Sequence, residues 1–131
     1  MEPIGKEPPA QAAQLPADVL IVEDDLIIAM DLEEIVQRVG VKLTRTATSV
    51  AQALELIAET PPQFALLDVG LRDETSLAIA DRLDALSVPF AFLTGYGARA
   101  MPLPRFLERP KLAKPFAAVD VEAVLRDWQK S

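Results

Sequence analysis

The chain of 131 residues contains no cysteine and no histidine. Without cysteine there is no disulfide, no thiol nucleophile and no cysteine-based metal site. Without histidine the chain has no imidazole base, no histidine metal ligand and no phosphohistidine of its own. Any chemistry must therefore depend on carboxylates, hydroxyls, lysine or a bound cation.

Basic residues are also outnumbered. Thirteen Lys and Arg against twenty Asp and Glu give a formal net charge of −7 at pH 7. Such a surface repels phosphate backbones, and the sequence contains no local basic patch that would offset the repulsion. We therefore expect no nucleic-acid partner.

Long apolar runs are missing as well. No run approaches the ~18 uninterrupted apolar residues of a membrane span. The segment 1–17 contains several prolines and lacks the apolar core of a secretory signal. We therefore expect a cytoplasmic protein without membrane contact, organised as a disordered tail over 1–17 and one domain over 18–131. The alternative interpretation of the tail is a docking arm for a partner.

After the tail, short apolar runs alternate with amphipathic segments. Continuous apolar runs are typical of strands buried on both faces, and a weakly alternating run is typical of an outer strand. The predicted strands cover residues 19–22, 41–46, 64–67, 88–93 and 112–113. The spacing of apolar residues predicts helices over 26–39, from Ser49 to Pro61, from Thr75 or Ser76 to Leu86, and over 117–130.

Five strand signals that alternate with helices predict an open α/β fold. We expect a flavodoxin-like, doubly wound, five-stranded parallel sheet with helices on both faces. Glycine and prolines between 96 and 110 predict an irregular fourth-helix region. In such sheets ligands bind beyond the carboxyl ends of the strands, where the winding direction changes. The polar residues of this chain collect at those ends.

Three carboxylates are expected to meet there. Glu23 and Asp24 follow the first predicted strand, and Asp68 follows the third. Neighbouring carboxylates disfavour each other's ionised form unless a cation neutralises them, and Mg²⁺ is a hard cation that takes oxygen ligands. The sequence therefore predicts a magnesium site, whereas the neighbouring Asp25 is interpreted as the cap of the following helix.

A hydroxyl and a lysine follow the remaining strands. Thr94 ends the fourth predicted strand, and Lys114 follows the last one. Together with Mg²⁺ they would complement the oxygens of a phosphoryl group, whose transfer requires positioning and charge neutralisation more than covalent activation. Asp68 would be the nucleophile and would form an aspartyl phosphate. No glycine-rich phosphate loop is present, so a nucleotide is not the obvious ligand.

In this order, these motifs resemble the receiver domains of two-component response regulators. The resemblance covers residues 18–131 and is carried by Val-Leu-Ile-Val-Glu23-Asp24-Asp25, Leu-Leu-Asp68, Thr94-Gly95 and Lys114-Pro115-Phe116. Phe92-Leu93-Thr94-Gly95-Tyr96 is similar to the motif of the single-domain FAT GUY receivers of alphaproteobacteria.

The resemblance implies a role for each acid. Asp24 would bind Mg²⁺ directly and Glu23 through water, while Asp68 would be both metal ligand and phosphoacceptor. The backbone carbonyl of Gly70 would complete the protein part of the metal shell. This set predicts Mg²⁺ as the cofactor.

The resemblance also implies which residues bind the phosphoryl group. Thr94 would be the switch hydroxyl, and Lys114 would pair with a phosphoryl oxygen. Most receivers carry an aromatic switch residue three positions before that lysine, where this chain has Lys111. The usual coupling of threonine to this aromatic residue is therefore absent, and Tyr96 is the candidate substitute.

The loop after the phosphoacceptor departs from the family pattern too. Most receivers have proline four residues and glycine eight residues after the phosphoacceptor, where this chain has Arg72 and Ser76. We therefore expect the loop after Asp68 to follow a different path.

The function implied is that of a stand-alone receiver phosphorylated by a sensor histidine kinase. In the FAT GUY subgroup the donors are kinases of the HWE and related classes, and some members serve the general stress response. No output domain fits after Lys130, so the signal is expected to leave through an unidentified protein partner, or the chain acts as a phosphate relay or sink. We expect no enzymatic activity beyond its own phosphorylation and dephosphorylation.

Two other functions stay open. The first is a pseudo-receiver that signals without phosphorylation, which the intact set of Glu23, Asp24, Asp68, Thr94 and Lys114 opposes. The second is a small Mg²⁺-dependent aspartyl phosphatase. Such enzymes need a second acid two residues after the nucleophile as general acid, and position 70 is glycine.

Overall fold

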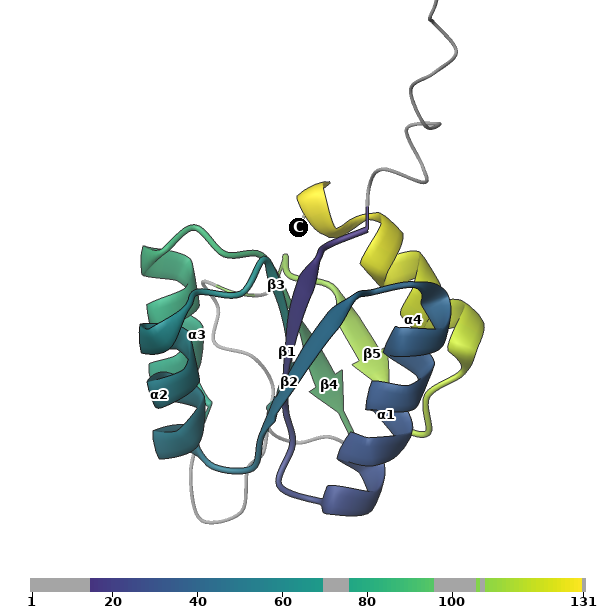
Figure 1. Ribbon diagram of the computed structural model, residues 1–131, viewed down its shortest axis with the longest axis horizontal. Coiled ribbons are helices and arrows are strands. Elements are labelled where there is room, and N and C mark those ends of the chain that lie inside the picture. The colour runs from purple at the N-terminus through teal and green to yellow at the C-terminus, as the bar shows by residue number, and fades with distance from the viewer. Residues whose placement is uncertain (1–14, 70–75, 96–105, 107, 131) are drawn as a thin grey trace, which may run out of the picture.

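The computed structural model of the chain describes residues 15–69, 76–95, 106 and 108–130. Its centre is a parallel sheet with the strand order β2–β1–β3–β4–β5 (Figure 1). The strands are β1 (Asp18–Val22), β2 (Leu43–Ala47), β3 (Phe64–Asp68), β4 (Phe90–Thr94) and β5 (Lys111–Ala113). The helices are α1 (Leu26–Val39), α2 (Val50–Glu59), α3 (Leu77–Ala85), α4 (Ala118–Arg126) and the short 3₁₀ helix η4 (Trp128–Lys130).

Helices cover both faces of the sheet, as the sequence predicted. Helices α1 and α4 pack on one face, and α2 and α3 pack on the other (Figure 1). The central strands β1 and β3 are consequently buried on both sides, which is why their apolar runs are continuous. The doubly wound, five-stranded parallel sheet is therefore confirmed. None of the helices in the described ranges has the length and apolar character that a bilayer crossing requires.

Several element boundaries differ from the predicted ones. β4 begins at Phe90 rather than at residue 88, so Val88 and Pro89 lie before the strand. The helix predicted over 117–130 ends at Arg126, and a 3₁₀ turn follows it. The region over 96–110, which the sequence predicts to be irregular, lies mostly outside the described residues.

The end of the predicted tail belongs to the domain. The Ala17 N–H donates to Gln63 Oε1 at 2.8 Å, and the Ala17 carbonyl accepts from the Leu43 N–H at 3.1 Å. Leu15 packs against the core on the face of α1 and α4, and Pro16 is buried. The domain therefore starts at least three residues earlier than predicted, and residues 1–14 lie outside the described part of the chain.

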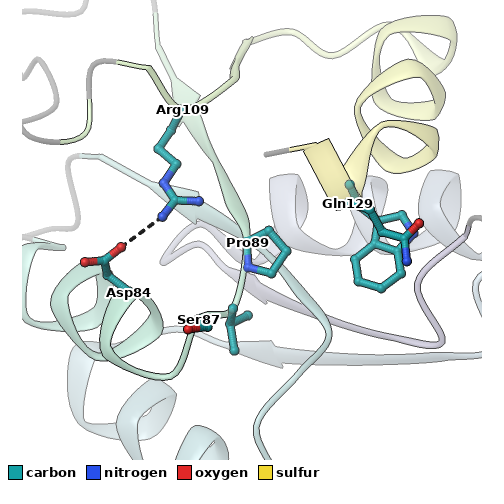
Figure 2. A pocket seen from close by; sticks show the side chains of 7 residues that line it. Asp84, Ser87, Pro89, Arg109 and Gln129 are labelled. Carbon is teal, nitrogen blue, oxygen red and sulfur yellow. Dashed lines mark hydrogen bonds and ion pairs between the residues drawn. The ribbon is translucent and has the colours of Figure 1, made fainter.

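Phe106 and Arg109, which precede β5, pack against the Phe90 ring of β4. Phe106 is buried against Phe90, with ring centroids 5.6 Å apart, and the Arg109 guanidinium lies over the Phe90 ring at 4.4 Å. Arg109 also forms an ion pair with Asp84 at 3.0 Å, the contact drawn in Figure 2. This pair borders a cavity of about 530 Å³ at the amino ends of the strands. The cavity is lined by Asp84, Ser87, Val88, Pro89, Arg109, Trp128 and Gln129.

One ion pair joins β1, β2 and α2. Arg45 on β2 donates Nε and Nη2 to the two carboxylate oxygens of Asp18, at 3.2 and 2.8 Å. The same guanidinium also donates to the Leu56 and Thr60 carbonyls at the end of α2, at 3.0 and 2.8 Å. Because both side chains of the pair are largely buried, one guanidinium satisfies four acceptors that solvent reaches poorly.

Replacing Arg45 with Ala is therefore expected to destabilise the fold by about 3 kcal/mol, since it leaves a partly buried carboxylate and two helix-end carbonyls without this donor. Urea denaturation measures the change. Arg38→Ala is the matched control, because Arg38 pairs with Glu34 on the exposed side of α1 and such pairs contribute about 0.5 kcal/mol. Equal losses in the two variants would contradict the role assigned to Arg45.

Candidate metal and phosphoryl site

The three predicted acids converge at the carboxyl ends of β1 and β3. Glu23 extends β1, and its N–H donates to the Ala47 carbonyl of β2 at 3.0 Å. Asp68 ends the neighbouring strand β3, so the pairing of β1 with β3 brings the acids together. Carboxylate oxygens of Glu23, Asp24 and Asp68 all lie within 4.8 Å of one another. Glu23 and Asp68 are buried, at 1% and 4% exposure.

Lys114 bridges two of these acids. Its Nζ lies 2.7 Å from Glu23 Oε1 and 3.4 Å from Asp68 Oδ2. The backbone sets this position, because the Lys114 N–H donates to the Thr94 carbonyl at 2.8 Å and so continues the pairing of β5 with β4. The ammonium group therefore faces the phosphoacceptor predicted from the sequence.

Three carboxylates and the ammonium group of Lys114 meet in this cluster among the described residues. The pKa of Glu23 rises there from 4.5 to about 7. Burial is the main cause, and the negative charge of Asp68 adds to it, while the contact with Lys114 and the hydrogen bond from the Asp25 N–H act in the opposite direction. The pKa of Lys114 is raised, because its contacts with Glu23 and Asp68 outweigh the lowering effect of burial. The lysine is thus held in its charged form.

The donor set fits a magnesium ion. Glu23 Oε1 is buried and accepts no hydrogen bond of favourable geometry from the described residues, although the Lys114 ammonium lies beside it. An ion at the cluster would offset the negative charge that Glu23, Asp24 and Asp68 bring together, and all three offer oxygen, the ligand atom that Mg²⁺ takes.

The raised pKa of Glu23 predicts a stability change with pH in the metal-free protein. The folded state holds a proton on Glu23 that the unfolded chain releases near pH 4.5, so this residue costs stability as pH rises from about 4.5 through 7. Between pH 5.5 and 8 in EDTA, wild type should lose roughly 2 kcal/mol of stability relative to Glu23→Gln. Urea denaturation of both proteins at the two pH values measures the difference. A constant difference would contradict this assignment.

Thr94 lies beside the acids, but its hydroxyl is directed elsewhere. Thr94 ends β4, the strand next to β3, and Oγ1 donates to the Leu112 carbonyl of β5 at 3.4 Å. Contact with a phosphoryl group on Asp68 would require this hydroxyl to turn away from β5. Gly70, Arg72 and Tyr96 lie outside the described residues, so their predicted roles stay predictions.

Asp25 and Ser76 each precede a helix, but only Asp25 caps its helix with its side chain. Asp25 Oδ1 accepts from the Ile27 and Ile28 N–H groups at 3.0 and 3.3 Å, which confirms it as the cap of α1. Ser76 precedes α3, but its side chain makes no capping hydrogen bond. It donates instead to the Val69 carbonyl at 3.3 Å. Of the two predicted caps, Ser76 holds the position before α3 but does not cap it with its side chain, and Thr75 lies outside the described residues.

The outer face of α1 carries a feature that the sequence interpretation missed. Leu26, Ile27 and Met30 are 60%, 80% and 65% exposed on the turns that follow the acids. These three side chains, which we call the α1 patch, lie on the first turns of α1, the helix that begins two residues after Asp24. The available signal was a helix with more apolar residues than one buried stripe can hold, because Leu32 and Val36 already face the core.

The comparisons with known proteins agree with this geometry. Residues 19–126 match the family model described as the response regulator receiver domain, and the chain belongs to that family. It is 36% identical over 121 residues to the phyllosphere-induced regulator PhyR of Methylorubrum extorquens, covering 87% of this chain and 44% of PhyR. The chain spans about half the length of the curated relatives it matches.

Solved structures show the same fold. The solution structure of SdrG from Sphingomonas melonis is 35% identical with a TM-score of 0.76, covering 88% of this chain and 97% of SdrG. The receiver domain of PhyR from Erythrobacter litoralis is 31% identical with a TM-score of 0.77, covering 90% of this chain and 93% of that domain. The protein is thus a receiver domain of two-component signalling, similar to PhyR and SdrG.

Proposed function

We propose that Asp68 accepts a phosphoryl group from the phosphohistidine of a sensor histidine kinase in a Mg²⁺-dependent reaction. The observation that carries the proposal is the meeting of Glu23, Asp24 and Asp68 within 4.8 Å, with Lys114 3.4 Å from Asp68 Oδ2. A buried carboxylate with an oxygen-rich metal site on one side and a fixed ammonium on the other has the surroundings that phosphoryl transfer needs.

The transfer forms one bond and breaks another. An Asp68 carboxylate oxygen bonds to phosphorus as the bond from phosphorus to the imidazole nitrogen breaks, and the electron pair leaves with that nitrogen. The product is an acyl phosphate on Asp68. Bound Mg²⁺, held by Glu23, Asp24 and Asp68, would neutralise charge on the phosphoryl oxygens. Lys114 pairs with another phosphoryl oxygen, and the Thr94 hydroxyl donates to the phosphoryl group once it leaves the Leu112 carbonyl.

The α1 patch supports a protein as the phosphoryl donor. A large phosphodonor must reach Asp68 at the carboxyl ends of the strands, and Leu26, Ile27 and Met30 are exposed on the first turns of α1, which begins two residues after Asp24. Exposed apolar side chains next to a charged site are typical of a protein-binding surface. We assign this surface to the kinase domain that carries the phosphohistidine. The proposal that this kinase is of the HWE or a related class depends on the likeness to FAT GUY receivers.

Phosphorylation is proposed to act through other proteins rather than through turnover of a separate substrate. The domain would signal by contact with a downstream protein, or pass the phosphoryl group on as a relay or sink. The intact acids and lysine favour this function over a pseudo-receiver. The glycine two residues after Asp68 opposes a phosphatase, which needs a general acid there.

Acetyl phosphate with Mg²⁺ tests the proposal. Intact mass should show one phosphoryl adduct on wild type, and none on Asp68→Asn or on wild type in EDTA. Absence of an adduct on folded wild type in Mg²⁺ would contradict the proposal and favour the pseudo-receiver. Rapid hydrolysis of unrelated phosphate esters would favour the phosphatase.

A further inference from the structure

The hydroxyl of Ser76 has an unusual partner. Serine before a helix commonly accepts a hydrogen bond from the helix backbone, as Ser49 does for α2 through the Gln52 N–H at 3.1 Å. Ser76 precedes α3 but forms no such bond. Its side chain is buried, at 6% exposure, and it donates to the Val69 carbonyl seven residues earlier.

The Val69 carbonyl belongs to the residue directly after the phosphoacceptor. Val69 follows Asp68, and its N–H donates to the Leu93 carbonyl of β4 at 3.2 Å. The Val69 side chain packs against the core on the face of α2 and α3. The residue is therefore fixed through its N–H and its side chain, and Ser76 fixes the carbonyl that is left. Val69 is half-buried, and a backbone carbonyl that solvent reaches poorly is generally paired with such a donor.

We propose that Ser76 is a positioning residue, which holds the backbone after Asp68 in the orientation that the metal site requires. The inference rests on the proposed function, because the site it serves is the magnesium site of Glu23, Asp24 and Asp68. Mg²⁺ demands near-ideal octahedral geometry, so a small rotation of the chain beside one ligand weakens binding. Ser76 acts through the Val69 peptide and does not itself touch the acids' ligand atoms.

Ser76 and Ser49 provide a matched comparison, because each precedes a helix. Ser76→Ala removes the donor to Val69, whereas Ser49→Ala removes a helix cap that takes no part in the magnesium site. Mg²⁺ affinity, measured by isothermal titration calorimetry with MgCl₂ alone, is expected to weaken about fivefold in Ser76→Ala, the equivalent of one hydrogen bond, and to stay at the wild-type value in Ser49→Ala. Thermal unfolding in EDTA, followed by circular dichroism, reports the stability of each variant separately.

Ser76→Thr keeps the hydroxyl, so it is expected to bind Mg²⁺ within twofold of wild type. It also serves as the informative variant if Ser76→Ala does not fold. Wild-type Mg²⁺ affinity in Ser76→Ala would overturn the proposal, as would a loss in Ser76→Thr equal to that in Ser76→Ala. If wild type itself binds no Mg²⁺, the result contradicts the proposed function, on which the role of Ser76 rests. Normal wild-type binding with an unaffected Ser76→Ala overturns only the role of Ser76.

Discussion

Asp24→Asn is expected to weaken Mg²⁺ binding at least a hundredfold and to stop phosphorylation by acetyl phosphate at millimolar Mg²⁺. The carboxylate of Asp24 lies with those of Glu23 and Asp68 in one cluster, and its charge is part of what would attract a divalent ion. The amide keeps the shape of the side chain but removes its charge, and a metal-ligand loss of this kind costs several kcal/mol. Calorimetric titration with MgCl₂ and intact mass after acetyl phosphate treatment measure the two effects.

Asp25→Asn is the matched control for this result. Asp25 is the adjacent carboxylate, but it accepts hydrogen bonds from the first turn of α1 and is exposed. Asparagine caps helices about as well as aspartate, so both stability and Mg²⁺ affinity should stay close to wild type. If Asp25→Asn weakened Mg²⁺ binding as strongly as Asp24→Asn, general negative charge rather than direct ligation would explain the site.

A double substitution in the α1 patch, Ile27→Gln with Met30→Gln, is expected to slow phosphotransfer from the cognate kinase about fiftyfold. Removal of two exposed apolar side chains takes away contact area that only a protein donor uses, and central interface residues contribute about 1–2 kcal/mol each. Phosphorylation by acetyl phosphate should be unchanged, because this donor is too small to contact the patch. Phosphotransfer rates measured with both donors give the ratio.

The control for this variant lies at the other end of the sheet. Leu43 and Leu86 are 50% and 39% exposed. Leu43 begins β2 and Leu86 directly follows α3, so both lie toward the amino ends of the strands, whereas the acids lie at the carboxyl ends. The double variant Leu43→Gln with Leu86→Gln also removes two exposed apolar side chains, with less exposed surface than Ile27 and Met30, and should leave both phosphotransfer rates unchanged. Equal slowing of the two donors in the α1 variant would show that the patch affects Asp68 itself and would contradict docking.

The sequence predicted the sheet and the acid cluster because both depend on local patterns. The apolar runs of β1 and β3 require burial on both faces, and acids directly after such strands must meet at the carboxyl edge of a parallel sheet. Thr94 was placed correctly beside the site. The direction of its hydroxyl, toward the Leu112 carbonyl, was not accessible, because that contact joins residues 18 positions apart.

The predictions that were wrong or incomplete also concern contacts between residues that are distant in the sequence. Ser76 has the residue type and position of a helix cap, and only the placement of Val69 near it gives its hydroxyl another acceptor. Ala17 looked like the end of a proline-rich tail, yet Gln63 and Leu43 lie within hydrogen-bond distance of it. Phe106 lay in a stretch without periodicity, but its ring completes a cluster with Phe90 and Phe92. Each contact depends on tertiary placement, which local patterns do not carry.

Trp128 is the chain's only tryptophan, and its location has a practical consequence. It borders the cavity at the amino ends of the strands, whereas the acids lie at the carboxyl ends. The ring is half-buried against the core, so its fluorescence should change when the fold is lost. The distance from the acids should keep that emission insensitive to whether ions or phosphate occupy them. Folding and occupancy can therefore be followed as independent optical and calorimetric signals in a single unlabelled sample.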